Sequence, residues 1–333
     1  VYRRAWPTEP LGSRWGNHMG MAFRYLPDVP ESRAPLTTTV FPTYGVMFRA
    51  HYDTPGETAM LFRIGANWGH WDTDALNLVL YGKGAPLSPG TGYQYYYGPA
   101  TEGNAIYHNR VKLGQPDLQE VFGRVDNELR DYGFGPYADY AAGSRYFPPE
   151  VFPDAGGEAW WNRHVMFLKS PRPDGANYFV VRDTFTAATP RPSWWTWMNL
   201  EGADRIRADG VAFEKDKAPY NRRAPETEME ARTGRVLELG TDYGAATWMA
   251  FSEPQAFRVR MTFDYDVGNS SRLGFAPEFL PRLPGKETKT IIESVGKPGQ
   301  EYFYVIYPRR NGEPAPTVTS PAPGCLKVVT PEG

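Results

Sequence analysis

The sequence has few of the features that mark disulfide scaffolds, membrane proteins and nucleic-acid binders. It holds one cysteine in 333 residues, Cys325, which excludes an internal disulfide. No apolar run approaches the roughly 18 residues that a membrane-spanning helix needs. A formal net charge of −2 argues against nucleic acid or an anionic membrane as a general partner. The chain opens with neither Met nor a signal peptide, so we expect a fragment or a processed chain.

Helical periodicity is also scarce. The stretch Pro116–Gly133 fits either a helix or a pair of strands equally well. Elsewhere apolar and polar residues alternate, and His164–Ser170 with Ala176–Phe185 predicts a hairpin across a Pro- and Gly-containing turn. The 34 glycines and 32 prolines are scattered, as in chains of short strands joined by turns. We therefore predict an all-β fold, a large antiparallel β-sandwich with more than ten strands.

The domain organisation follows from where this alternation begins. Residues 1–36 are punctuated by Arg and Pro and are expected to form an irregular connector. Residues 37–333 are expected to form the sandwich, and the polar stretch 215–235 is the best place for a subdivision. Aromatic residues make up 15% of the chain, which fits both packing between strands and a surface that stacks on sugar rings.

Histidine is rare, with five in the chain, yet His70 lies between two tryptophans in the segment Trp68–Asp74, "WGHWDTD". If this segment is a strand, His70, Asp72 and Asp74 share one face. Such a stripe suits a solvated edge strand, a metal site of imidazole and carboxylate ligands, or general acid–base chemistry at His70. The neighbouring Trp68 and Trp71 favour the wall of a cleft.

Four elements in order, "YGVMFR", "HWDTDALNLVLYGKGAPL", "PGTGY" and "YHN", lie between Tyr44 and Gly114. This pattern resembles the β-sandwich domain of the heparinase II/III-like polysaccharide lyases, a family that includes oligoalginate lyases. The segment Arg163–Phe185 resembles the next hairpin of that family. The resemblance implies a supersandwich-like fold that follows an α/α toroid domain. Nothing in this chain resembles the toroid, so either residues 1–36 are its tail or the toroid is absent from this chain.

The resemblance also implies site residues. His70 falls at the active-site histidine of the family, and Tyr93 at its catalytic acid or base. His108 falls at a metal ligand, whereas a second ligand histidine is replaced by Asp72 and a ligand aspartate falls at Pro89. The chain is thus expected either to hold one divalent metal, zinc or calcium, at Asp72 and His108, or to bridge the same strands with hydrogen bonds.

Residues around this site are expected to bind substrate. We assign that role to Trp68, Trp71, Tyr95 and Arg110. Arg110 and Lys112 are expected to share a strand face with His108 and to attract an anionic chain, although a solvated face would explain Lys112 as well. Asn109 is expected to orient His108 or the backbone, and His164 either supports its strand or lines the cleft.

The expected function is β-elimination on a uronic-acid-containing polysaccharide or oligosaccharide, with Tyr and His as acid and base. Two alternatives stay open: a glycoside hydrolase that uses Asp72 and Asp74, whose spacing suits such enzymes, and a non-catalytic carbohydrate-binding sandwich. The implied partners are an anionic saccharide and the toroid domain, with no nucleic acid and no membrane. The resemblance implies a periplasmic or extracellular bacterial location, and self-association stays open.

Overall fold

The computed structural model describes residues 35–64, 74–88, 108–113, 127–149, 156–199, 205–212, 231–241, 243–255, 257–266, 288–322 and 324–332. The chain divides into two compact units, Val1–Leu36 and Thr37–Gly333, and all the elements below belong to the second. Most of the polar stretch 215–235 lies outside the described residues. Within the described ranges, no helix is long and apolar enough to cross a membrane.

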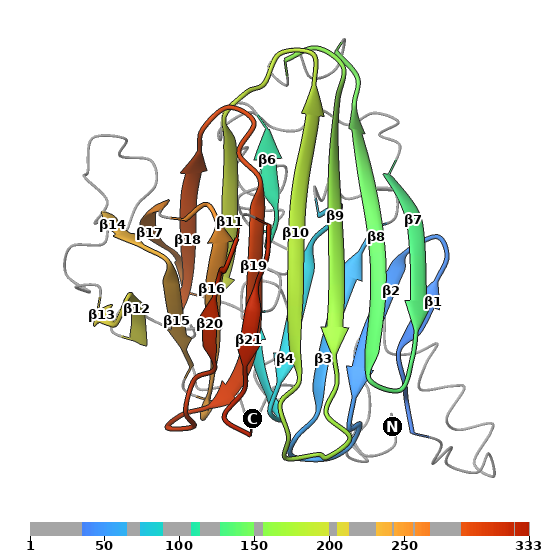
Figure 1. Ribbon diagram of the computed structural model, residues 1–333, viewed down its shortest axis with the longest axis vertical. Coiled ribbons are helices and arrows are strands. Elements are labelled where there is room, and N and C mark those ends of the chain that lie inside the picture. The colour runs from blue at the N-terminus through green and yellow to red at the C-terminus, as the bar shows by residue number, and fades with distance from the viewer. Residues whose placement is uncertain are drawn as a thin grey trace, which may run out of the picture. The chain divides into compact units, whose positions relative to one another are not determined.

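The described part of the chain forms 21 strands in four antiparallel sheets, which confirms the predicted all-β sandwich (Figure 1). Sheet A has the order β1 (Thr39–Phe41), β2 (Gly45–Ala50), β3 (Thr58–Arg63), β4 (Leu78–Gly82), β5 (Ala85–Ser88). Sheet B has the order β14 (Ala231–Gly234), β17 (Phe257–Asp266), β18 (Thr288–Gly296), β11 (Ser193–Asn199), β6 (Val111–Leu113).

Sheet C is the largest, with nine strands. Its order is β13 (Val211–Ala212), β12 (Ile206–Ala208), β15 (Val236–Gly240), β16 (Ala245–Glu253), β19 (Tyr302–Arg310), β10 (Tyr178–Ala187), β9 (Ala159–Leu168), β8 (Ala138–Phe147), β7 (Asn127–Phe134). Sheet D pairs β20 (Thr317–Thr319) with β21 (Lys327–Val329).

Two sequence expectations can be compared with these strands. The hairpin is confirmed as β9 and β10, which pair from Ala159 opposite Ala187 to Leu168 opposite Tyr178. A helix does not run to Gly133, because β7 already begins at Asn127 and pairs with β8. Leu129 lies opposite Gly143 in this pair and packs against the core. Its apolar side chain is therefore buried from a strand and not from a helix.

The core lies between sheet C on one side and sheets A and B on the other. In sheet A, Phe48 meets Phe167 and Phe179 of sheet C edge-on, each at a centroid distance of 6.2 Å. In sheet B, Trp195 meets Phe251 of β16 at 5.3 Å and Tyr304 of β19 at 5.9 Å, again edge-on. Sheet A therefore covers β9 and β10, and sheet B covers β16 and β19. Sheets A and B lie along the same inner face of sheet C (Figure 1).

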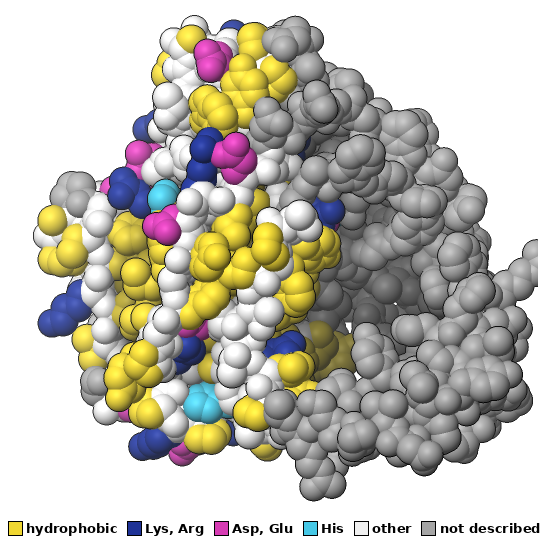
Figure 2. All heavy atoms as spheres, turned by 90° about the vertical axis from the view of Figure 1, so that its right-hand side faces the viewer, with side chains coloured by type: hydrophobic (Ala, Val, Ile, Leu, Met, Phe, Trp, Pro, Cys, Tyr) yellow, Lys and Arg dark blue, Asp and Glu magenta, His cyan; other side chains and the backbone are white. Residues whose placement is uncertain are grey.

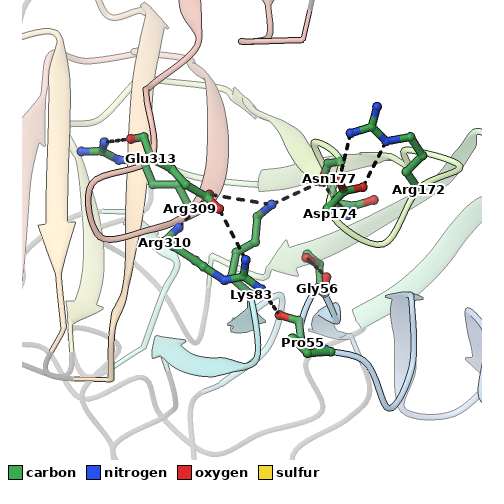
Figure 3. A network of polar contacts seen from close by, with 11 residues as sticks. Pro55, Gly56, Lys83, Arg172, Asp174, Asn177, Arg309, Arg310 and Glu313 are labelled. Atoms are coloured by element: carbon green, nitrogen blue, oxygen red, sulfur yellow. Dashed lines mark hydrogen bonds and ion pairs between the residues drawn. The ribbon is translucent and has the colours of Figure 1, made fainter.

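Turns at one end of the sandwich are joined by polar contacts (Figure 3). Lys83, in the turn between β4 and β5, donates from Nζ to the Gly175 carbonyl at 3.2 Å and lies 3.8 Å from the Glu313 carboxylate. Arg310 donates from Nη2 to the Pro55 carbonyl at 3.0 Å. These contacts join sheet A to the turns that leave β9 and β19.

The outer face of sheet C is only partly covered. Trp248, Val305 and Tyr307 are buried there under Val318 and Val328 of sheet D. At the β7 edge of sheet C, large side chains are also exposed, namely Tyr132, Phe134 and Tyr137 at 53, 43 and 66%. The register puts Tyr132 opposite Ala141, so it belongs to the inner face where the covering sheet ends. Figure 2, which looks onto the β7 side, shows hydrophobic side chains at that surface.

Candidate functional site

The predicted catalytic residues belong to the connections between β3 and β4 and between β5 and β6. Six predicted site residues lie outside the described residues: Trp68, His70, Trp71, Asp72, Tyr93 and Tyr95. Their roles stay predictions. The structure does describe the chain on the C-terminal side of each connection, at Asp74–Asn77 and at His108–Arg110, and it brings these two flanks together.

Asn109 is the centre of this junction. Its backbone N–H donates to Asn77 Oδ1 at 2.8 Å, and its side-chain Nδ2 donates to the Leu78 carbonyl at 2.5 Å and to Ser88 Oγ at 2.7 Å. Its Oδ1 accepts from the Met198 N–H at 2.6 Å. One buried amide thus joins the start of β4, the end of β5 and the end of β11. The structure confirms that Asn109 orients the backbone.

Beneath Asn109 lies a buried ion pair. Arg163 and Asp183 have no exposed surface, and the carboxylate accepts from Arg163 Nε at 2.7 Å and from Nη2 at 3.0 Å. Trp161 Nε1 donates to the same carboxylate at 2.8 Å. Burial alone would lower the pKa of Arg163, but the charge of Asp183 and its hydrogen bonds outweigh this and raise the pKa above its usual value. Arg163 is therefore held in its charged form in the core.

The third guanidinium nitrogen of Arg163, Nη1, joins the two flanks Asp74–Asn77 and His108–Arg110. Arg163 Nη1 donates to the Leu76 carbonyl at 2.7 Å and to the Asn109 carbonyl at 2.8 Å. Leu76 has a φ of 56°, which is uncommon for a residue other than glycine and carries a conformational cost. A charged donor on its carbonyl and full burial of its side chain hold that conformation. Arg163 thus fixes the chain that follows His70 against the chain that follows Tyr93.

Arg110 and Lys112 differ from expectation. The strand face that they were expected to share with His108 does not exist, because β6 begins only at Val111 and His108–Arg110 form a bend. Lys112 is 3% exposed, so a solvated face is excluded for it. Arg110 has no exposed surface, and its guanidinium lies 5.3 Å from the centre of the Trp161 ring. This burial does not favour the predicted contact of Arg110 with substrate.

Of the predicted stripe of His70, Asp72 and Asp74, the structure describes Asp74. Asp74 precedes β4 in a turn, where its carbonyl accepts from the Asn77 N–H at 3.0 Å, so it is not part of a strand. Its carboxylate forms an ion pair with Arg63, whose guanidinium lies 5.2 Å from the centre of the Tyr44 ring. The second carboxylate of the hydrolase alternative, Asp72, lies outside the described residues, so the separation of the two carboxylates stays untested.

The described residues do not form a metal site. Among them, no group of three His, Cys, Asp or Glu side chains could hold an ion. His108 is buried, and its carbonyl accepts from Thr196 Oγ1 at 2.6 Å. Ser88, next to Pro89 at the expected aspartate position, uses its hydroxyl as donor to the Met198 carbonyl and as acceptor from Asn109. These bonds bridge the sheets. Asp72, the other predicted ligand, lies outside the described residues, so metal binding stays a prediction and we derive no step through a metal.

His164 lies on the opposite face of β9 from Arg163, because side chains alternate along a strand. Its Nδ1 lies 2.8 Å from the hydroxyl of Tyr140, and the two rings stack at a centroid distance of 6.1 Å. Burial lowers the pKa of His164 and raises that of Tyr140. Both shifts favour the neutral forms, and the residue does not share the face of the Asn109 junction.

Arg163 and Asp183 were not recognised as site residues from sequence. A usable signal exists, because the register of the β9–β10 hairpin places Arg163 directly opposite Asp183. Opposite charges that face each other at core positions of two strands indicate a buried ion pair.

Comparison with solved structures shows what this sandwich is similar to. The crystal structure of the heparan sulfate lyase HepC from Pedobacter heparinus matches over 95% of this chain with a TM-score of 0.59 and 14% identity. A crystal structure of heparinase III matches over 91% with a TM-score of 0.57 and 12% identity, and another heparinase III gene product over 94% with 0.57 and 13%. The chain spans 46, 44 and 45% of their respective lengths. No family model and no curated protein matches it.

Proposed function

We propose that this chain is the β-sandwich part of a polysaccharide lyase that cleaves a uronic-acid-containing polysaccharide or oligosaccharide by β-elimination. The observation that carries the proposal is the fold, shared over 95% of the chain with a heparan sulfate lyase. The Asn109 junction supports it further, because buried polar bonds bring together the chain segments that follow the two connections carrying His70 and Tyr93. A catalytic pair in these connections would then be attached to a rigid part of the sandwich.

β-Elimination sets three requirements. The proton on C5 of the uronate is abstracted, the bond from C4 to the leaving oxygen breaks, and a double bond forms between C4 and C5. The reaction needs a base at C5, an acid at the leaving oxygen and a positive charge or hydrogen bonds on the carboxylate. Tyr93 and His70 are proposed as the base and acid, and Tyr93 must have a pKa below its usual value of about 10 to act near neutral pH.

The Asn109 junction is proposed to position the catalytic residues and not to take part in the reaction itself. Arg163 and Asn109 are buried, so their proposed effect acts through the backbone of Leu76, Leu78 and His108–Arg110. The group that neutralises the uronate carboxylate is proposed to belong to a toroid partner domain, consistent with a chain that spans 46% of the HepC length. Metal binding by Asp72 and His108 and a periplasmic or extracellular location belong to the same proposal.

The test is a panel of uronate polysaccharides incubated with the full-length protein. Elimination creates a double bond conjugated to the carboxylate, so ultraviolet absorbance should rise with the right polymer. Tyr93→Phe and His70→Ala should abolish the rise while leaving thermal unfolding unchanged. An exposed tyrosine gives the matched control, and Tyr137→Phe should keep full activity.

Three results would contradict the proposal. Cleavage without the chromophore would favour a hydrolase, and saccharide binding without turnover would favour a binding module. Full elimination activity in both Tyr93→Phe and His70→Ala would remove these residues from the mechanism.

A further inference from the structure

The outer face of sheet C carries a hollow at its β12 end that has no part in the site above. It encloses a volume of about 270 Å³, and its lining comes from β15, β16, the segment around β12 and the end of β19: Arg205, Arg207, Glu238, Gly240, Ala246, Arg309, Asn311 and Gly312. That volume is just below the roughly 300–1,000 Å³ of sites for drug-sized ligands. The hollow therefore suits one small group rather than a long chain.

Strand register explains why the surface is hollow here. Gly240 lies opposite Ala246, and Ala246 lies opposite Arg309 on β19. On the other side of Gly240, the Arg205 Cβ would lie only 3.1 Å from an added Cβ. Directly opposed residues point to the same face of an antiparallel sheet. Gly240 and Ala246 therefore form the floor of the hollow, with Arg205 on one side and Arg309 on the other. Neighbouring strands are about 4.8 Å apart, which leaves room for a ligand between these walls.

The lining has an excess of positive charge. Among the described residues of the lining, three arginines face one carboxylate, Glu238, which gives a formal charge of +3 − 1 = +2. Glu238 lies 3.8 Å from Arg207 Nη1 and 3.4 Å from Arg309 Nη2, longer than the roughly 2.7–2.9 Å of a charge-assisted hydrogen bond. Glu238 therefore makes only long contacts with Arg207 and Arg309.

Two arginines are also held in position. Arg205 Nη1 donates to the Thr241 carbonyl at 2.9 Å, and Arg309 Nη1 donates to the Glu313 carbonyl (Figure 3). Arg309 Nε is buried and has no hydrogen-bond partner within the described part of the chain. Because this nitrogen has almost no accessible surface, a ligand in the hollow would be held by the terminal nitrogens of the guanidinium groups.

We propose that this hollow binds a single oxyanion, the carboxylate or sulfate group of an acidic sugar. Guanidinium groups match the geometry of such oxyanions and hold them by paired N–H donors. The choice of a sugar as the carrier rests on the proposed function, whereas the anion site rests on the geometry alone. A second contact of this kind would retain an anionic chain on the sandwich independently of the cleft.

The experiment is calorimetric titration of the purified full-length protein with sodium glucuronate, with sodium sulfate and with neutral glucose at low ionic strength. One or both anions should bind and glucose should not, and the anion that binds identifies the group. Arg205→Ala and Arg309→Ala should each weaken binding about tenfold to a hundredfold, the range for losing a charged hydrogen bond. Glu238→Gln should tighten it, because a competing negative charge is removed.

Two further variants keep the outcome clear. Arg182→Ala is the matched control, since Arg182 is an exposed arginine of sheet C paired with Glu301, and its loss should leave binding unchanged. Ala246→Leu fills the floor without removing a charge and should also abolish binding. Equal affinity in wild type, Arg309→Ala and Ala246→Leu, or binding of glucose as tight as that of either anion, would overturn the site.

The readout needs no turnover, so it separates this site from the proposed function. Anion binding in a protein with no elimination activity would leave the site standing and contradict the lyase. Elimination activity in a protein that binds neither anion would overturn the site alone.

Discussion

Replacement of Arg163 by Met tests the buried junction most severely. The change leaves the Asp183 carboxylate fully buried without its ionic partner and removes the donor shared by the Leu76 and Asn109 carbonyls. Breaking a buried ion pair from one side costs about 3–5 kcal/mol, and each buried carbonyl left without a donor adds about 1–3 kcal/mol, not fully additively. We expect a loss of at least about 4 kcal/mol, against a typical total of about 5–15 kcal/mol.

Urea unfolding followed by tryptophan fluorescence would measure this loss. The double variant Arg163→Met with Asp183→Leu removes both charges, so it should recover about 3 kcal/mol. It should nevertheless stay far below wild-type elimination activity, because the Leu76 and Asn109 carbonyls still lack their donor. Arg172→Met is the control: its ion pair with Asp174 is exposed, and it should cost less than about 1 kcal/mol.

The reasoning fails in either of two cases. A loss below about 1 kcal/mol in Arg163→Met would mean that the pair is not a buried, charged unit. Wild-type turnover in the double variant would mean that Arg163 does not position the two connections.

Three further variants test separate parts of the structure. Asn109→Asp should lower activity at least as much as Asn109→Ala, because a carboxylate would face the Leu78 carbonyl; a near-wild-type rate would contradict this. Gly143→Ala should cost about 1–3 kcal/mol in urea unfolding, because its Cβ would lie 2.7 Å from a Leu76 methyl and 3.1 Å from Phe62. Burial lowers the pKa of His164 below its ordinary 6.5, so the stability it contributes is complete above that pH and is lost as pH falls through the lowered value. The melting temperature should therefore fall less between about pH 7 and pH 5 in His164→Gln than in wild type, and equal slopes would refute the assignment.

The strands were predictable because they depend on local alternation. Turn residues and period-two patterning placed the β9–β10 hairpin, since its register is set within a short stretch of chain. The junction was only partly predictable. A role for Asn109 in orienting the backbone was expected, but its partners Leu78, Ser88 and Met198 come from three strands that meet only in the folded chain.

Arg110 and Arg163 show why the remainder was not predictable. A strand pattern cannot tell whether a charged residue lies over solvent or against a second sheet. Arg110 was expected to attract substrate, and its guanidinium instead lies beside Trp161 in the core. Arg163 is tolerated there because Asp183 is opposite it and two carbonyls accept its remaining N–H groups.

The central claim is that the protein breaks uronate chains by elimination. Digestion of its preferred uronate polymer in water labelled with heavy oxygen, followed by mass spectrometry, tests this most directly. We predict products whose new non-reducing end is lighter by one water than a hydrolysis product and whose new reducing end carries no label. Labelled oxygen at the new reducing end, with full-mass products, would contradict the account.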